Sequence, residues 1–78
     1  MNTNPLEALK KAIEVAGSQA ELSRRIAKHD KPIKQQHVWN WVNRDEKVPA
    51  EVVLAIEAET GVSRHDLRPD IYPRENVA

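Results

Sequence analysis

Apolar residues recur along the chain at the three- and four-residue spacing of amphipathic helices, and no stretch alternates as a half-buried strand would. The first stripe consists of Leu6, Leu9, Ile13 and Ala16. Asn4 followed by Pro5 is typical of a helix start, and Gly17 is typical of a helix end. The pattern therefore predicts a first helix over residues 5–16.

Ser18 opens the next segment, and Glu21 three positions later completes a capping box. The inward positions of this second helix are Ala20, Leu22, Ile26 and Ala27. The helix is expected to end near Lys28, because residues 29–33 are mostly polar and include a proline. A third helix is predicted over about residues 34–43, and its apolar stripe consists of Val38, Trp41 and Val42.

Residues 43–47 are polar and highly charged and predict a loop. Pro49 then takes a first-turn position in a fourth helix that ends at Gly61, with a stripe made of Val52, Val53 and Ile56. A short fifth helix is expected between Ser63 and Leu67. The prediction is an all-α fold of about five short helices.

The expected organisation is one domain over residues 1–68, followed by an extended C-terminal tail over residues 69–78. Two prolines flank Ile71 and Tyr72 in this tail and limit its freedom before docking. We therefore expect residues 69–73 to pack on the fourth helix or on a second subunit.

The composition suits a single small globular domain: 78 residues, 40% hydrophobic and 31% charged, without cysteine. Disulfides and the cysteine ligands of zinc fingers are therefore excluded. No apolar run approaches the roughly 18–20 residues of a membrane span, and no secretory leader is recognisable. We expect a cytoplasmic protein with no membrane partner.

No catalytic set, cofactor site or metal site is expected. The sequence has no glycine-rich phosphate loop and no nucleophile beside a base. His29, His37 and His65 lack the spacing of metal ligands on one helix. The best enzyme case would pair His37 with Asp45 or Glu46, but nothing in a charged loop would hold those acids in place. We therefore expect a protein that is not an enzyme.

The formal net charge is zero, but it is unevenly distributed. Residues 18–47 carry seven basic and four acidic side chains, whereas residues 48–78 carry three basic and six acidic ones. A basic middle and an acidic end favour a nucleic-acid partner for the middle segment.

The same middle segment has the arrangement of a helix-turn-helix motif. Leu22 and Ile26 would form the core of the first motif helix, with Ser23 as the small residue at the crossing. Val38 and Trp41 would anchor the second motif helix, which leaves its other positions facing outward: Gln35, Gln36, His37, Trp39, Asn40 and Asn43. Glutamine and asparagine pair bidentately with adenine in the major groove, so this edge is suited to reading bases.

Trp39 has two interpretations. It lies about 160° around the helix from Trp41, so the two rings cannot share one buried face. Trp39 either packs partly against the fourth helix or the loop, or it contacts DNA.

Residues 17–26 (GSQAELSRRI) resemble the first motif helix of phage Cro and CI-type repressors, and residues 35–42 (QQHVWNWV) resemble their recognition helix. Residues 48–51, 56–57, 60–61 and 64–73 are closer still to the YdaS-like, Cro-like regulators of lambdoid prophages. The resemblance covers about residues 6–73. It implies a bacterial helix-turn-helix repressor that binds double-stranded operator DNA and is nucleoid-associated when bound. Some members are discussed as antitoxins.

By position, the resemblance places Gln35, Gln36 and Asn40 at base-contacting sites and Gln19 at a phosphate contact. His37 is a further candidate for base reading. The other candidates for phosphate contacts are Lys34, Asn43, Arg44 and Lys47.

One departure concerns the spacing of the motif. Leu22 and Val38 lie sixteen residues apart, whereas eleven separate the matching positions of the usual motif. The five extra residues fall at 28–32. Either the first motif helix is longer, or the turn is a loop.

A single recognition helix reads only a few base pairs, so a homodimer or higher homo-oligomer on half-sites about 34–36 Å apart is expected. The candidate dimer or partner surface consists of Leu54, Val62, Ile71 and Tyr72. The same surface would serve the alternative function, an antitoxin or adaptor whose main partner is a toxin or another regulatory protein.

Overall fold

The computed structural model describes residues 4–29 and 32–73. Within these ranges the chain is all-α, with helices α1 (Pro5–Ala16), α2 (Gln19–Ala27), α3 (Gln35–Asn40), α4 (Val53–Thr60) and α5 (Arg64–Leu67). A π-helical turn (Trp41–Asp45) continues α3, and a 3-10 turn (Ala50–Val52) leads into α4. Neither range contains a strand. None of the helices described there is long and apolar enough to cross a membrane.

The helix boundaries follow from the capping residues visible in the sequence. The side chains of Asn4 and Ser18 each accept a hydrogen bond from the backbone N–H three residues later, at 2.8 and 3.1 Å. Gly17 and Gly61 end α1 and α4 with φ angles of 115° and 80°, which a residue without a Cβ adopts freely. Ser63, where the fifth helix was expected to begin, caps α5.

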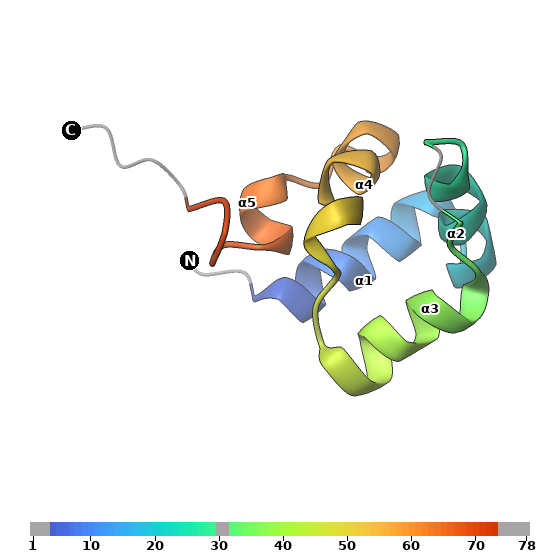
Figure 1. The fold of residues 1–78 in the computed structure, drawn as a ribbon, viewed down its shortest axis with the longest axis horizontal. Helices are drawn as coiled ribbons and strands as arrows, with labels where there is room; N and C mark the ends of the chain where they lie inside the picture. The colour runs from blue at the N-terminus through green and yellow to red at the C-terminus, as the bar shows by residue number, and fades with distance from the viewer. Residues whose placement is uncertain (1–3, 30–31, 74–78) are drawn as a thin grey trace.

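The helices pack around one core, in which α1 contacts α2, α4 and α5, and α2 packs against α3 and α4. Figure 1 shows α2 and α3 at one end of the molecule and α5 at the other. The buried apolar residues are Ala8, Leu9, Ala12, Ala16, Leu22, Ile26, Val38, Trp41, Val48, Val52, Val53, Ala55, Ile56 and Leu67. Two of them, Val38 and Trp41, anchor α3 and its π turn and so fix which face points outward.

Two local predictions were wrong. Residues 43–47 are not simply a loop, because the π turn extends the helical backbone to Asp45 and Glu46 then reverses it with a φ of 59°. The Asn43 side-chain amide donates to the carbonyl of Trp39 (3.0 Å), a local bond that competes with regular helical pairing. Ala27, expected to face inward, is exposed at the last position of α2.

The described part of the expected tail, residues 69–73, contains a turn instead of running fully extended. The backbone N–H groups of Ile71 and Tyr72 both donate to the carbonyl of Arg68. Tyr72 is partly buried and packs against the core. Residues 74–78 of the expected tail lie outside the described residues.

Of the two explanations for the wide spacing between Leu22 and Val38, the structure supports a loop between the two motif helices. Helix α2 ends at Ala27, and α3 begins at Gln35 with Lys34 as its N-cap residue. The five extra residues therefore fall in the connection, of which residues 30 and 31 lie outside the described ranges. The phase of the α3 side chains is the one expected from a helix that starts at Lys34.

Candidate nucleic-acid interface

Helix α3 has a buried side and an outward side that are set by its two anchors. Val38 is fully buried and Trp41 is 4% exposed. At about 100° per residue, the positions opposite these anchors are residues 36, 39, 40 and 43. The outward face thus presents three amides and one indole, from Gln36, Trp39, Asn40 and Asn43. We call these four residues the outer face of α3.

Two amides of the outer face bond to each other. Gln36 Nε2 donates to Asn40 Oδ1 at 3.3 Å, across one turn of the helix. The bond uses one hydrogen of Gln36 and one acceptor site of Asn40, so each amide keeps its other polar group for a ligand. The bond sets the relative position of two side-chain amides, the chemical group that pairs bidentately with adenine.

The other candidates for base reading differ in how they are held. Gln35 is exposed at the first position of α3, and it lines a shallow hollow together with Gln36 and Trp39. His37 has a structural role, because its Nδ1 accepts the backbone N–H of Lys34 at 2.9 Å and so caps the helix. In the neutral ring, this bond places the proton on Nε2. Gln35 and Gln36 therefore line the same hollow, whereas one ring nitrogen of His37 is occupied by the hydrogen bond that caps α3.

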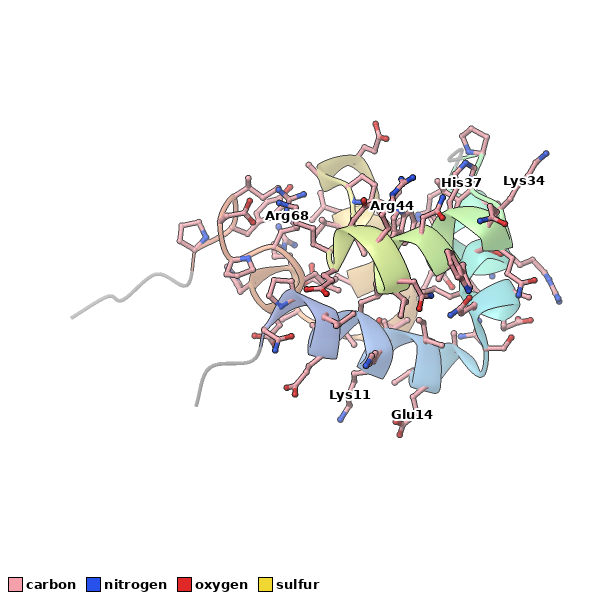
Figure 2. All side chains as sticks on the ribbon, turned by 90° about the horizontal axis from the view of Figure 1, so that it is seen from below. Lys11, Glu14, Lys34, His37, Arg44 and Arg68 are labelled. Atoms are coloured by element: carbon pink, nitrogen blue, oxygen red, sulfur yellow. The ribbon has the colours of Figure 1, made fainter. Side chains whose placement is uncertain are left out.

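The candidates for phosphate contacts lie around the ends of this helical unit. Figure 2 shows Lys34 at one end and Arg44 toward the other. Arg44 Nε pairs with Asp45 at 3.1 Å, so a phosphate would have to compete for it. Asn43 uses its Nδ2 on the carbonyl of Trp39. Lys47 is exposed beyond the π turn, where its charge helps to lower the pKa of the Asp70 carboxyl.

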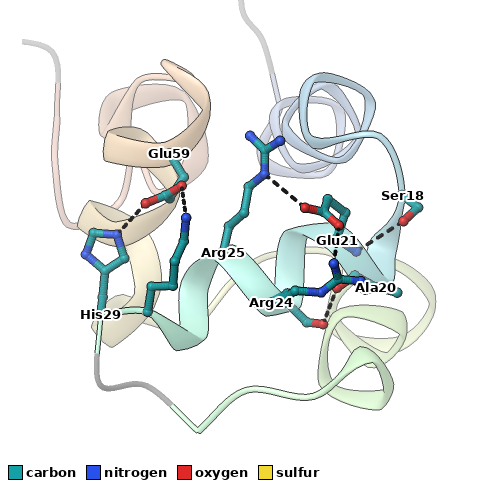
Figure 3. A network of polar contacts seen from close by, with 9 residues as sticks. Ser18, Ala20, Glu21, Arg24, Arg25, His29 and Glu59 are labelled. Atoms are coloured by element: carbon teal, nitrogen blue, oxygen red, sulfur yellow. Dashed lines mark hydrogen bonds and ion pairs between the residues drawn. The ribbon is translucent and has the colours of Figure 1, made fainter.

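Gln19 is half-buried at the first position of α2, and the three charged side chains that follow it in α2 pair with one another. Arg24 and Arg25 both pair with Glu21, at 3.0 and 3.5 Å, as Figure 3 shows. Glu21 therefore neutralises the charge of one arginine, and α2 keeps a net charge of +1 from its two arginines and one glutamate.

A second ion-pair group joins the end of α2 to α4 (Figure 3). Lys28 Nζ lies 3.7 Å from one Glu59 oxygen, and His29 Nε2 lies 2.8 Å from the other. The hydrogen bond from His29 is the main cause that lowers the pKa of Glu59. These contacts tie the start of the extended connection to the body of the protein.

The candidate dimer or partner surface is only partly free. Leu54 and Ile71 are 47% and 42% exposed. Val62 and Tyr72 are partly buried and pack against the protein's own core. Val15, which the sequence pattern did not single out, is also exposed, and it lines a hollow with Val62 between α1 and the α4–α5 connection.

Arg68 is a further residue that the sequence pattern did not single out. Its guanidinium donates to both Asp70 carboxylate oxygens, at 2.9 and 2.7 Å, and to the carbonyl of Val48 at 2.8 Å. The first of these interactions lowers the pKa of Asp70 to about 2. Arg68 thus joins the segment before α4 to the turn after α5, and no regular spacing in the sequence would have indicated this.

The comparison with protein families gives a match that covers most of the chain. Residues 9–76 match the family described as "Bacterial toxin YdaS". The chain belongs to the YdaS family. This agrees with the resemblance to YdaS-like regulators, and the all-helical fold is consistent with it. The YdaS-family chain matches no curated protein and no solved structure.

Within the described part of this YdaS-family chain, no group of three or more histidine or acidic side chains is arranged to hold a metal ion. The side chains that the structure does gather on one exposed helix are amides and an indole, flanked by basic residues. This chemistry suits recognition of a polar, negatively charged partner.

Proposed function

We propose that this protein is a sequence-specific double-stranded DNA-binding repressor of Cro type, which reads operator half-sites with α3 in the major groove. The outer face of α3 carries the proposal. It combines an exposed Gln36, hydrogen-bonded to a half-buried Asn40, with an exposed Trp39, and basic residues stand at its two ends. Bound at an operator, the protein would block polymerase by occupying its path.

Different side chains would have different roles. Gln35, Gln36 and Asn40 would read base edges, with His37 limited to its Nε2 because Nδ1 caps the helix. Lys34, Arg44 and Lys47 would neutralise phosphates, which gives affinity and orientation but no sequence information. The remaining phosphate contacts would come from Gln19 and Asn43.

The repressor would act as a homodimer, because one helix of this length reads too few base pairs for adequate specificity. Two copies would place their α3 helices in successive major grooves, about 34–36 Å apart. Leu54 and Ile71, the exposed members of the candidate dimer surface, offer apolar area that a self-contact would remove from water.

A binding-site selection from random double-stranded DNA, followed by titration of the selected site, tests the proposal. Gln36→Ala and Asn40→Ala should each weaken binding to the selected site by about 1–3 kcal/mol and change binding to random DNA little. Glu14→Gln is the matched control, because Glu14 projects from α1 away from α3 (Figure 2). Equal losses on selected and random DNA would remove these amides from the base-reading role.

A second function, inhibition of bacterial growth, is favoured by the description of the family as a toxin. A DNA-binding protein can inhibit growth by occupying host promoters, so the two functions are compatible. Induced expression in bacteria tests the connection. If growth inhibition by the wild-type chain is lost in Gln36→Ala and retained in Glu14→Gln, inhibition acts through DNA. If both variants inhibit growth equally, the target is not DNA.

The remaining alternative is an antitoxin or adaptor whose main partner is another protein. The exposed Leu54 and Ile71 would then contact that partner in place of a second copy. Such a protein would select no sequence from random DNA, and changing Leu54 to a charged residue would remove its partner while leaving α3 unaffected.

A further inference from the structure

We propose that Trp39 is a specificity-determining residue that contacts the C5-methyl group of a thymine, and that the outer face of α3 therefore selects half-sites that contain A·T pairs. The inference rests on the proposed function, because it assumes that α3 enters the major groove. It goes further by naming the bases that this chain should prefer.

The position of Trp39 is the first observation. Its side chain is 50% exposed, whereas Trp41, two residues later, is 4% exposed. Trp39 is the only large aromatic side chain with this exposure in the described parts of the chain. It belongs to a helix whose rotation about its own axis is set by the buried Val38 and Trp41. The side-chain amide of Asn43 also donates a hydrogen bond to the backbone carbonyl of Trp39. The indole is thus presented from a fixed site instead of a loop.

The surroundings of Trp39 are the second observation. With Gln35 and Gln36 it lines a shallow open hollow. One wall of this hollow is therefore apolar and the other is made of amides that donate and accept hydrogen bonds. A base edge with a methyl group beside a polar group would match both walls.

The chemistry of the groove then selects the base. Thymine is the one base that presents a methyl group in the major groove, next to its O4 acceptor, and its partner adenine is the base that glutamine and asparagine read. Guanine is read mainly by arginine or lysine, and the cytosine amino group by acidic side chains. The outer face of α3 contains none of these four charged residue types. Its amides and indole match A·T pairs.

The experiment uses the full chain and the site obtained by selection. Each thymine of the half-site is replaced in turn by deoxyuridine, which removes only the methyl group. Wild-type protein should lose about fourfold in affinity at one thymine per half-site, the value expected for one buried methyl group. Trp39→Ala should bind the thymine site more weakly and should no longer distinguish it from the deoxyuridine site.

Val15→Ala is the matched control, because it shortens another exposed apolar side chain, on α1. It should keep the full sensitivity to deoxyuridine. Thermal unfolding of both variants checks that the fold is intact, which is expected because neither side chain is buried.

The outcomes separate the inference from the function on which it rests. If a site is selected and bound tightly but deoxyuridine has no effect at any position, DNA binding stands and the thymine contact is wrong. If no DNA is preferred over random sequence, both proposals fail. If Trp39→Ala leaves operator affinity unchanged but abolishes self-association, Trp39 belongs to a protein interface and the inference is overturned.

Discussion

At the scale of single residues, the structure divides the polar side chains of α3 between holding the helix and meeting a ligand. Gln36 and Asn40 bond only to each other, on an exposed face. His37 instead accepts the N–H of Lys34, which would otherwise lack a partner at the helix start. In the sequence, His37 could not be distinguished from Gln36 and Asn40. A polar residue on the outward face of a helix gives no sign in the sequence that it caps a backbone group.

The capping role of His37 leads to a prediction about stability. His37→Ala should lower the free energy of unfolding by about 0.5–1.5 kcal/mol, because one backbone donor loses its partner. His37→Gln, which keeps an acceptor at the third helical position, should retain most of that free energy. Chemical denaturation of the two variants measures the difference. Equal stability of His37→Ala and wild type would contradict the capping role.

Asp70 gives a prediction about pH. The hydrogen bonds from Arg68 lower the pKa of Asp70 to about 2, below its usual value near 3.8. A lowered pKa stabilises the folded state above the unfolded value, so this contribution is complete above about pH 4 and is lost as the pH falls through 2. An NMR titration of the Asp70 carboxyl should show a midpoint near 2 in the wild type and a higher one in Arg68→Ala. The same midpoint in both proteins would exclude the Arg68 contact as the cause.

At the scale of elements, the sequence predicted best where one residue decides a boundary. Asn4, Ser18, Gly17 and Gly61 each act locally, through a side chain or a missing Cβ, and each lies where predicted. The π turn was not predicted because it depends on how Trp41 reaches the core and on the bond from Asn43 to the Trp39 carbonyl. Such features arise from packing and leave no periodic signal in the sequence.

Glu46, which ends the π turn, carries a prediction of its own. Its φ of 59° makes it the one non-glycine residue with positive φ in the described ranges. Glu46→Gly should stabilise the protein by about 0.5–1 kcal/mol, since the relief of the left-handed conformation exceeds the added freedom of the unfolded chain. Lys47→Gly, at a position without positive φ, should destabilise it. Thermal unfolding would contradict the argument if both variants shifted the melting temperature in the same direction.

At the scale of the whole molecule, the family, the all-helical fold and the core anchors Leu22, Ile26, Val38 and Trp41 could be predicted from the sequence. The arrangement of charge could not. The pairing of Lys28 and His29 with Glu59 joins residues 31 and 30 positions apart, and it depends on how α2 and α4 pack. A charge count by segment therefore overestimates the basic surface available to a phosphate backbone.

The turn after α5 was expected to dock, and the structure shows what it docks against. Tyr72 packs on the core, its carbonyl lies 2.8 Å from His65 Nδ1, and the Arg64 guanidinium lies 5.7 Å from the centre of its ring. These contacts are all made within one chain. The docking thus contributes to the stability of the monomer, whether or not Ile71 also meets a second copy.

Deleting residues 69–78 should therefore lower the melting temperature at every protein concentration, because the truncated chain loses the Tyr72 packing and the Arg68–Asp70 pair. A partly buried tyrosine is worth about 1–2 kcal/mol, which corresponds to roughly 4–16 °C for a domain of this size. Deleting residues 74–78 alone removes none of these contacts and is the matched control.

Sedimentation of both truncated chains over a range of protein concentrations then shows whether residues 69–73 contribute to self-association. If Ile71→Ser, in an otherwise intact chain, weakens self-association while leaving the melting temperature of the dilute protein unchanged, Ile71 belongs to the dimer surface. If the longer deletion melts like the full chain, the docking of Tyr72 does not stabilise the monomer.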